Sequence, residues 1–256
     1  MLDWEGCFNV RDVGGLPTAD GQTVRHGALV RADSLTRLTE AGCATARAHG
    51  ISVVIDLRSS HEFAEGEPVI RRLRSGPALE TAGPHPFCAL DGVVYRQMRL
   101  RDYSDEEFTA RVRSAKSQVD IYRMIIRDGA AAFARVAREV IAAPPGAVVV
   151  HCSVGKDRTG LIVAVLLSAV GVPDEAIAAD YARSEECLRP FADFRRALGV
   201  APSGPEPAAE HLKAPVDQMM TLLAELRDQY GGAADYLRAG GLSDAELAAL
   251  RRRLVG

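Results

Sequence analysis

A cysteine and an arginine six positions apart carry side chains suited to phosphate chemistry. Cys152 follows the apolar run 147–150, and Arg158 stands beyond a turn that contains Gly155. A fully extended chain would hold the two side chains about 20 Å apart, whereas a tight turn lets both face one small anion. A thiolate is a strong nucleophile, and a guanidinium binds two phosphoryl oxygens at once. The pair therefore predicts nucleophilic attack on a bound phosphate group.

The turn between these two residues can itself bind the anion. In open α/β sheets, ligands bind where the C-terminus of a strand meets the N-terminus of a helix. When residues 153–158 curl over such a junction, their backbone N–H groups point inward and form an anion-binding nest, which also stabilises a thiolate at Cys152. We therefore expect the phosphate to contact the loop and its end: Ser153, Val154, Gly155, Lys156, Asp157, Arg158 and Thr159.

Four residues near this turn have predicted supporting roles. Thr159 can donate its hydroxyl to the sulfur, which makes the thiolate a better leaving group in a second step. His151 is expected to hold the turn by hydrogen bonding, because the sequence identifies no partner for it as a protease base. Asp56 and Arg58 lie at the end of another apolar run, and they form either a structural pair or part of the site.

The elements that must position this turn alternate between strands and helices. β-branched apolar runs predict buried strands at 51–57 and 147–150, and weaker patterns predict extended chain at 24–30 and 93–98. Helices are expected at 36–49 (capped by Asp33 and Ser34), 104–117, 119–141, 159–170, 174–186, 216–230, 233–239 and 243–254. This order predicts an α/β fold whose central, mostly parallel sheet is flanked by helices and followed by an all-helical C-terminal tail.

The chain of 256 residues is expected to form one domain, residues 1–256. The segment 201–207 contains three prolines, so we expect a loop over 201–213 before the C-terminal helices. Those helices are too few to form a stable module alone, which favours packing on the same core.

Composition argues against several other classes of protein. The 31 lysines and arginines nearly balance the 34 aspartates and glutamates, so no nucleic-acid partner is expected. The longest apolar run, residues 161–172, is too short to span a bilayer, and the N-terminus lacks the hydrophobic stretch of a signal peptide. Five scattered cysteines favour a reducing compartment, and six histidines without ligand spacing favour a site with no metal or cofactor. We therefore expect a cytoplasmic enzyme or binding domain.

The segment HCSVGKDRTG resembles the signature of cysteine-dependent protein tyrosine phosphatases, H-C-x5-R-[ST]. Its lysine and aspartate are typical of an atypical bacterial group within that family. Three upstream segments add to the resemblance: NVRDVGG at 9–15, LVRAD at 29–33, and IDLRS at 55–59 followed by Glu62.

That resemblance implies hydrolysis of phosphate monoesters in two steps without a metal. Cys152 would form a thiophosphate intermediate that water hydrolyses, and Arg158 would bind the phosphoryl group. Family substrates are phosphotyrosine and, for some members, phosphoserine, phosphothreonine or phosphoinositides. Lys156 would add a second positive charge, as in members that accept acidic or inositol phosphates. Oxyanions such as vanadate or phosphate are expected to inhibit.

The resemblance does not identify the general acid. The eukaryotic branch uses an aspartate in a Trp-Pro-Asp loop, but Trp4 is the only tryptophan and no such tripeptide exists here. The candidates are Asp157, which is preferred, and Asp56.

Other interpretations fit the loop less well. A nucleotide-binding Walker loop needs glycine at position 150 and a serine or threonine at 157, where this chain has Val150 and Asp157. A sulfurtransferase also has a lone cysteine after a strand, but the DRTG ending favours phosphate chemistry. Two alternatives stay open: a phosphoinositide phosphatase with the same chemistry, and an inactive phosphate-binding module.

Overall fold

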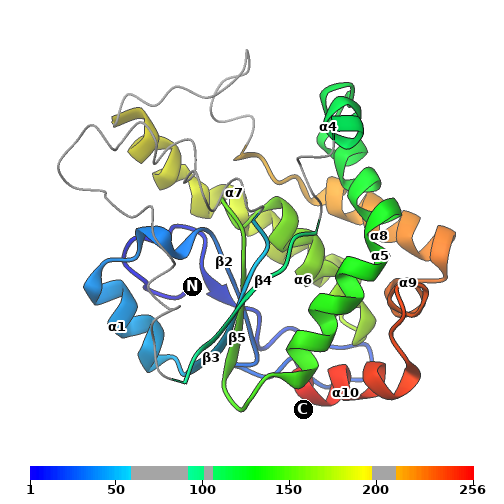
Figure 1. Ribbon diagram of the computed structural model, residues 1–256, viewed down its shortest axis with the longest axis horizontal. Helices are drawn as coiled ribbons and strands as arrows, with labels where there is room; N and C mark the ends of the chain where they lie inside the picture. Colours follow the sequence, from blue (N-terminus) through cyan, green and yellow to red (C-terminus); the bar gives the residue numbers. More distant parts are fainter. Residues whose placement is uncertain (59–91, 101–105, 198–211) are drawn as a thin grey trace.

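A five-stranded, mostly parallel sheet forms the centre of the computed structural model (Figure 1). The structure describes residues 1–58, 92–100, 106–197 and 212–256. The strands are β1 (Arg11–Asp12), β2 (Leu29–Ala32), β3 (Ile51–Asp56), β4 (Val94–Gln97) and β5 (Ala147–His151), and their order across the sheet is β1-β2-β5-β3-β4. β1 is antiparallel to β2, and the other neighbours are parallel. The predicted α/β fold with a mostly parallel sheet is therefore confirmed.

The central strand β5 is buried along its whole length. Its three consecutive valines suit a parallel strand that is covered on both faces. His151, its last residue, pairs with Ala32 of β2 and Asp56 of β3. The carboxyl ends of three parallel strands therefore meet at one edge of the sheet.

Helices cover both faces of the sheet. They are α1 (Glu40–Ala48), α4 (Glu106–Arg113), α5 (Gln118–Ala142), α6 (Asp157–Ala169), α7 (Asp174–Ala197), α8 (Val216–Tyr230), α9 (Ala233–Ala239) and α10 (Asp244–Leu254). Figure 1 shows α1 on one side of the sheet and α5 on the other. Val149 packs in the cluster that includes Ala46 of α1, whereas Val148 and Val150 face the larger cluster that includes α5 and α6. This alternation follows from the two-residue period of a strand.

The C-terminal helices share the main core of the sheet. Leu226 of α8, Leu237 of α9 and Leu250 of α10 belong to the same buried cluster as Val150. The expected all-helical tail therefore packs against the sheet domain. None of the helices described is long and apolar enough to cross a membrane.

Several predicted boundaries were wrong. The helix expected at 36–49 is a short 3₁₀ turn, Leu35–Arg37, followed by α1, and the side chain of Thr39 caps α1 by accepting a hydrogen bond from the Gly42 N–H. Asp33 does not cap this helix, because its carboxylate accepts hydrogen bonds from the Phe8 and Asn9 backbone amides instead.

Other differences concern the extent of elements. Helix α7 continues to Ala197, well beyond the predicted end at 186, with Pro190 inside it. The extended chain expected at 24–30 forms β2 only from Leu29 onward. Ser59, Glu62, residues 104–105 and most of the loop predicted at 201–213 lie outside the described residues.

Candidate active site

The cysteine and the arginine lie at the carboxyl edge of the sheet. β5 ends at His151, and α6 begins at Asp157, so a loop of five residues joins the central strand to a helix N-terminus. Cys152 is 1% exposed at the start of this loop. Arg158, in the first turn of α6, is partly buried, and its Nη1 donates to the Leu57 carbonyl at 3.4 Å. The strand–loop–helix arrangement expected around Cys152 is therefore present.

Three consecutive backbone carbonyls of the loop are bonded to the surrounding framework. The bonds run from Ser34 N to Ser153 O at 2.9 Å, from Asn9 Nδ2 to Val154 O at 3.0 Å, and from Arg31 Nη2 to Gly155 O at 2.8 Å. In a trans peptide the C=O and N–H groups point to opposite sides. The N–H groups of residues 154–156 therefore point away from this framework, which is the orientation needed for an anion-binding nest.

Gly155 permits this tight loop for two physical reasons. Its φ of +69° lies in the left-handed region, which costs little only for glycine. A Cβ at this position would lie 2.5 Å from the Ala32 carbonyl oxygen at the end of β2. The loop therefore presses directly against the neighbouring strand.

Thr159 contributes a buried hydroxyl next to the loop. The residue is fully buried, and within the described part of the chain its Oγ1 has no hydrogen-bond partner. A buried hydroxyl left unpaired costs free energy, so a ligand or a reacting atom that accepts its hydrogen bond would stabilise it. This state is compatible with the predicted donation to sulfur.

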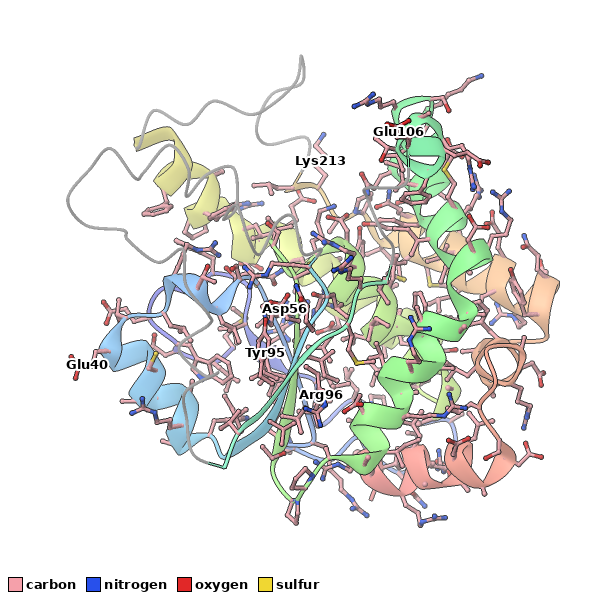
Figure 2. All side chains as sticks on the ribbon, viewed as in Figure 1. Glu40, Asp56, Tyr95, Arg96, Glu106 and Lys213 are labelled. Atoms are coloured by element: carbon pink, nitrogen blue, oxygen red, sulfur yellow. The ribbon has the colours of Figure 1, made fainter. Side chains whose placement is uncertain are left out.

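Asp56 and Arg58 form a tight buried pair behind the loop. The Asp56 carboxylate accepts hydrogen bonds from Arg58 Nη2 at 2.6 Å and from the Tyr95 hydroxyl at 2.6 Å. Figure 2 labels Asp56 and Tyr95, which come from the neighbouring strands β3 and β4. Burial raises the pKa of Asp56, but the neighbouring His151 ring and the Arg58 guanidinium outweigh it and hold the pKa well below the usual range. Arg58 Nη1 in turn donates to Ser34 Oγ at 3.1 Å, so the pair steadies a residue that holds the loop.

His151 lies beneath the loop and is fully buried. Its Nδ1 is 3.2 Å from the Cys152 carbonyl oxygen, and its Nε2 is 3.6 Å from the Asp56 carboxylate. Burial lowers the pKa of His151 below its usual value, which favours the neutral ring at pH 7. These contacts fit the structural role predicted for it.

Lys156 and Asp157 form an ion pair where the loop meets α6. Lys156 Nζ lies 2.7 Å from Asp157 Oδ1, and the Lys156 side chain is only 2% exposed. The ammonium group is therefore directed at the neighbouring Asp157, whereas the family resemblance implied that it adds a second positive charge for the substrate. Asp157 keeps 28% of its side chain exposed.

Two further groups from α5 hold Asp157. The Tyr122 hydroxyl donates to its Oδ1, and Gln118 Nε2 donates to the same atom at 3.2 Å. Burial raises the pKa of Asp157, but the charge of Lys156 and the hydrogen bonds from Lys156 and Tyr122 bring the pKa below its usual value. Sequence reasoning missed Tyr122, because no local pattern marks a buried tyrosine as a partner of a distant loop.

A second set of missed residues lies deeper, where Asp180 of α7 contacts two arginines. Its carboxylate is 2.7 Å from Arg11 Nε and 2.6 Å from Arg31 Nη1. Burial raises the pKa of Asp180, but Arg31 and Arg11 together lower it to about 2. The only sequence signal for these partners was that both arginines belong to the upstream segments of the resemblance.

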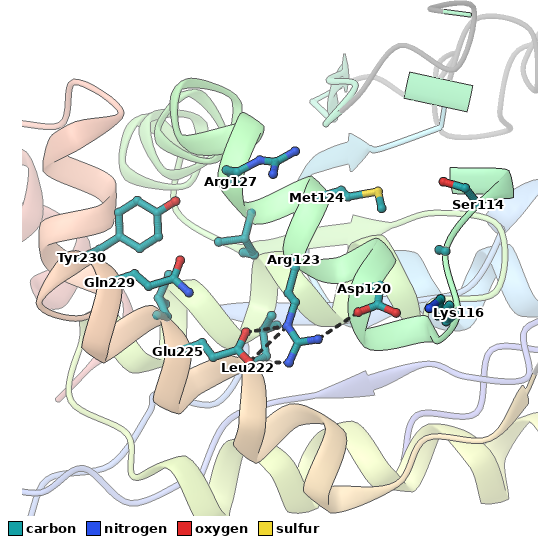
Figure 3. Close-up of a pocket in the computed structure, with 13 residues that line it drawn as sticks. Ser114, Lys116, Asp120, Arg123, Met124, Arg127, Leu222, Glu225, Gln229 and Tyr230 are labelled. Atoms are coloured by element: carbon teal, nitrogen blue, oxygen red, sulfur yellow. Dashed lines mark hydrogen bonds and ion pairs between the residues drawn. The ribbon is translucent and has the colours of Figure 1, made fainter. Parts of the chain in front are cut away.

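A cavity of about 470 Å³ between α5 and α8 is separate from the loop (Figure 3). It shares none of its lining residues with the segment 151–159. Three of its charged groups pair with one another, since Arg123 contacts Asp120 at 2.9 Å and also binds Glu225. Among the residues described, no group of three or more histidines, cysteines or acidic residues is placed to hold a metal ion.

The fold and the loop together define a phosphatase of the cysteine-dependent class. A model of the tyrosine phosphatase family matches residues 2–256, so the chain belongs to that family. It is 32% identical over 278 aligned positions, covering 98% of both chains, to the triple specificity protein phosphatase PtpB of Mycobacterium tuberculosis. It is also 30% identical to a tyrosine-protein phosphatase of Nostoc commune, over 93% of this chain and 78% of the relative.

Proposed function

We propose that the whole chain, residues 1–256, acts as one phosphatase domain in which Cys152 attacks phosphotyrosine. The observation that carries this proposal is the orientation of the loop, whose carbonyls at residues 153–155 are bonded to the framework on one side. Three amide N–H groups and the α6 N-terminus then serve an anion at Cys152. Arg158 would complete the phosphate site from the first turn of the same helix.

The proposed reaction has two steps, transfer of the phosphoryl group to Cys152 and hydrolysis of the phosphocysteine. The Cys152 thiolate attacks phosphorus, the P–O ester bond breaks, and Asp157 gives its proton to the departing oxygen. Water then attacks the phosphocysteine and gives a proton to the Asp157 carboxylate as the S–P bond breaks. The Thr159 hydroxyl stabilises the returning thiolate, in keeping with its burial and its lack of a partner among the described residues.

Asp157 suits the role of proton donor better than Asp56. Asp157 is the first residue of α6, directly after the loop, and remains 28% exposed, so a substrate oxygen can approach it. Asp56 is fully buried and committed to Arg58 and Tyr95, with a strongly lowered pKa that keeps it ionised. We therefore assign Asp56 and Arg58 to positioning the loop.

We propose that substrates include phosphoserine and phosphothreonine as well as phosphotyrosine. Support comes from the name of the Mycobacterium tuberculosis relative, which describes a triple specificity protein phosphatase. Rates on phosphotyrosine, phosphoserine and phosphothreonine peptides and on a soluble phosphoinositide would rank these substrates. We propose a cytoplasmic location, because the four cysteines described are all free thiols, as a reducing compartment favours.

The decisive experiment replaces the nucleophile. Cys152→Ser is expected to bind phosphate but to lose turnover of p-nitrophenyl phosphate, because an alcohol of high pKa cannot replace a thiolate. Vanadate should inhibit the wild type competitively, and EDTA should leave the rate unchanged. Turnover by the serine variant, or loss of activity with EDTA, would overturn the proposal.

A further inference from the structure

Two buried arginines behind the phosphate loop share a single carboxylate. Arg11 is 0% exposed and Arg31 is 1% exposed, and both form ion pairs with Asp180. Their other partners are neutral: Arg11 also contacts Asn9 Oδ1 and Ser184 Oγ, and Arg31 also contacts Ser184 Oγ and the Gly155 carbonyl. The two arginines together with the carboxylate of Asp180 are called the buried arginine pair below, and the net charge given for it includes Asp180.

The charges of the buried arginine pair do not balance. Two guanidinium groups and one carboxylate leave a net charge of +1, and no other acidic residue in the described part of the chain is ion-paired with either arginine. The nearby phenol of Tyr181 is neutral at pH 7, because burial raises its pKa. A buried charge without a counter-charge is costly, so the pair favours an anion nearby.

The remaining charges around the loop are already matched within the protein. Asp56 pairs with Arg58, Lys156 with Asp157, and Asp33 with Arg37. Burial lowers the pKa of His151, so its ring adds no charge at pH 7. A surplus positive charge at this edge of the sheet therefore comes from the buried arginine pair.

Arg31 brings that surplus directly to the loop. Its Nη1 holds Asp180 at 2.6 Å, while its Nη2 donates to the Gly155 carbonyl at 2.8 Å. The Gly155 carbonyl and the Lys156 N–H belong to the same peptide group and point to opposite sides of the chain. The guanidinium charge thus polarises a peptide whose other end faces the anion site.

We propose that Arg31 is a positioning residue whose charge keeps Cys152 ionised, and that the Cys152 thiolate, or the phosphate dianion that replaces it, is the counter-charge of the buried arginine pair. The inference rests on the proposed function, because it takes Cys152 as the nucleophile. If Arg31 instead served only to hold the Gly155 carbonyl in place, the charge of its side chain would not affect the ionisation of Cys152.

Four variants separate charge from bracing. Arg31→Gln removes one charge and leaves the pair neutral, whereas Arg31→Lys keeps the charge and loses the fork of donors. Arg31→Gln with Asp180→Asn restores a net charge of +1 through Arg11. Arg11→Gln also neutralises the pair, yet it leaves the bond from Arg31 to Gly155 in place.

The measurement is the rate at which iodoacetamide modifies Cys152 at each pH. The mass of the peptide that contains Cys152 reports how much of it has been modified. We expect the midpoint pH to rise by about one unit in Arg31→Gln and Arg11→Gln, equivalent to about tenfold less thiolate. In Arg31→Lys and in the double variant the midpoint should return close to that of the wild type. Thermal melts identify the variants that fold. If Arg31→Gln does not fold, the midpoint measured for Arg11→Gln tests the proposal instead.

The outcomes distinguish this inference from the function on which it rests. A wild-type Cys152 with the midpoint of an ordinary thiol would overturn both. A low wild-type midpoint that Arg11→Gln and Arg31→Gln leave unchanged would overturn this inference alone. A raised midpoint in Arg31→Gln that the double variant does not restore would assign Arg31 to bracing and would also overturn it.

Discussion

The two carboxylates nearest the loop differ in what their surroundings allow them to do. Asp56 is enclosed and bonded to Arg58 and Tyr95, so it remains ionised and holds its partners in place. Asp157 is also bonded, but part of its side chain faces solvent. A bound phosphate dianion raises the pKa of an adjacent carboxyl group, which favours the protonated Asp157 that the first step needs.

At the scale of single residues, the substitution Asp157→Asn tests the proposed proton donor. We expect kcat on a phosphotyrosine peptide to fall by about 10²- to 10⁴-fold, because the departing oxygen loses its proton donor. The loss should be smaller on p-nitrophenyl phosphate, whose leaving group is stable without a proton. The measurement is the ratio of kcat values for the two substrates.

Asp56→Asn is the matched control for that experiment. It is expected to lower stability and raise KM, because it releases the Arg58 guanidinium, but to affect both substrates equally. A leaving-group dependence in Asp56→Asn and none in Asp157→Asn would reverse the assignment of these two residues.

At the scale of elements, three helices reach Asp157 through a chain of polar groups. The Tyr122 hydroxyl of α5 contacts Asp157 and lies 2.8 Å from the Tyr181 hydroxyl of α7. Tyr181 in turn donates to Gln218 of α8 at 2.9 Å. The packing of these helices therefore sets the position of Asp157, although none of them belongs to the loop.

Removing the first hydroxyl of this chain should move the pH dependence. Tyr122→Phe removes a hydrogen bond that lowers the pKa of Asp157, so that pKa rises. A hydrogen bond of this kind contributes about 1 kcal/mol, and the alkaline limb of the kcat profile should shift upward by up to about one pH unit. Tyr181→Phe, which does not touch Asp157, should shift it less. Identical profiles for Tyr122→Phe and the wild type would contradict the role of this bond.

The contact between β2 and the loop gives a second test at this scale. Gly155→Ala places a Cβ 2.5 Å from the Ala32 carbonyl oxygen and also strains a positive φ. We expect at least tenfold lower kcat/KM, since misplacing a catalytic loop by about 1 Å has costs of this order or more. Gly27→Ala is a matched control, because Gly27 has the same φ of +69° with nothing within 4 Å. Equal activity losses in the two variants would show that backbone strain alone is responsible.

At the scale of the whole molecule, Asp180 joins the N-terminal strands to α7 and, through Arg31, to the loop. The pKa of Asp180 is about 2 in the folded chain, below the value near 3.9 of an unfolded aspartate. The folded state therefore binds this proton less readily than the unfolded state. The resulting stability is complete above the unfolded pKa and disappears as the pH falls through the folded one.

This linkage predicts a loss of stability in acid. The contribution of Asp180 to the free energy of unfolding is on the order of 2 to 3 kcal/mol at neutral pH and is lost between about pH 5 and pH 1. Urea unfolding across that range measures it. The variant that combines Arg31→Gln with Asp180→Asn lacks this carboxylate, so its free energy of unfolding should fall less steeply. Equal slopes for the two proteins would contradict the assignment.

The sequence alone determined what is local. A run of valines, a cysteine, a glycine turn and an arginine are contiguous, so the strand, the loop and the helix that follows it were predictable from one segment, which also contains the proposed nucleophile. The same holds for the parallel sheet, because alternating strand and helix patterns leave few other arrangements. The start of α1 was not predictable, because Asp33 has the side chain of a helix cap but its carboxylate binds the distant Phe8 and Asn9 amides.

Only the tertiary structure decided which distant groups hold the loop in its active shape. Asn9 and Arg31 reach the loop carbonyls across 145 and 124 residues of sequence. Asp180 and Tyr122 likewise come from helices α7 and α5, and the hydrophobic pattern of a helix indicates only which of its faces is buried. The physical reason is that hydrogen bonds and ion pairs depend on distances of a few ångströms, and these arise only after the chain has packed.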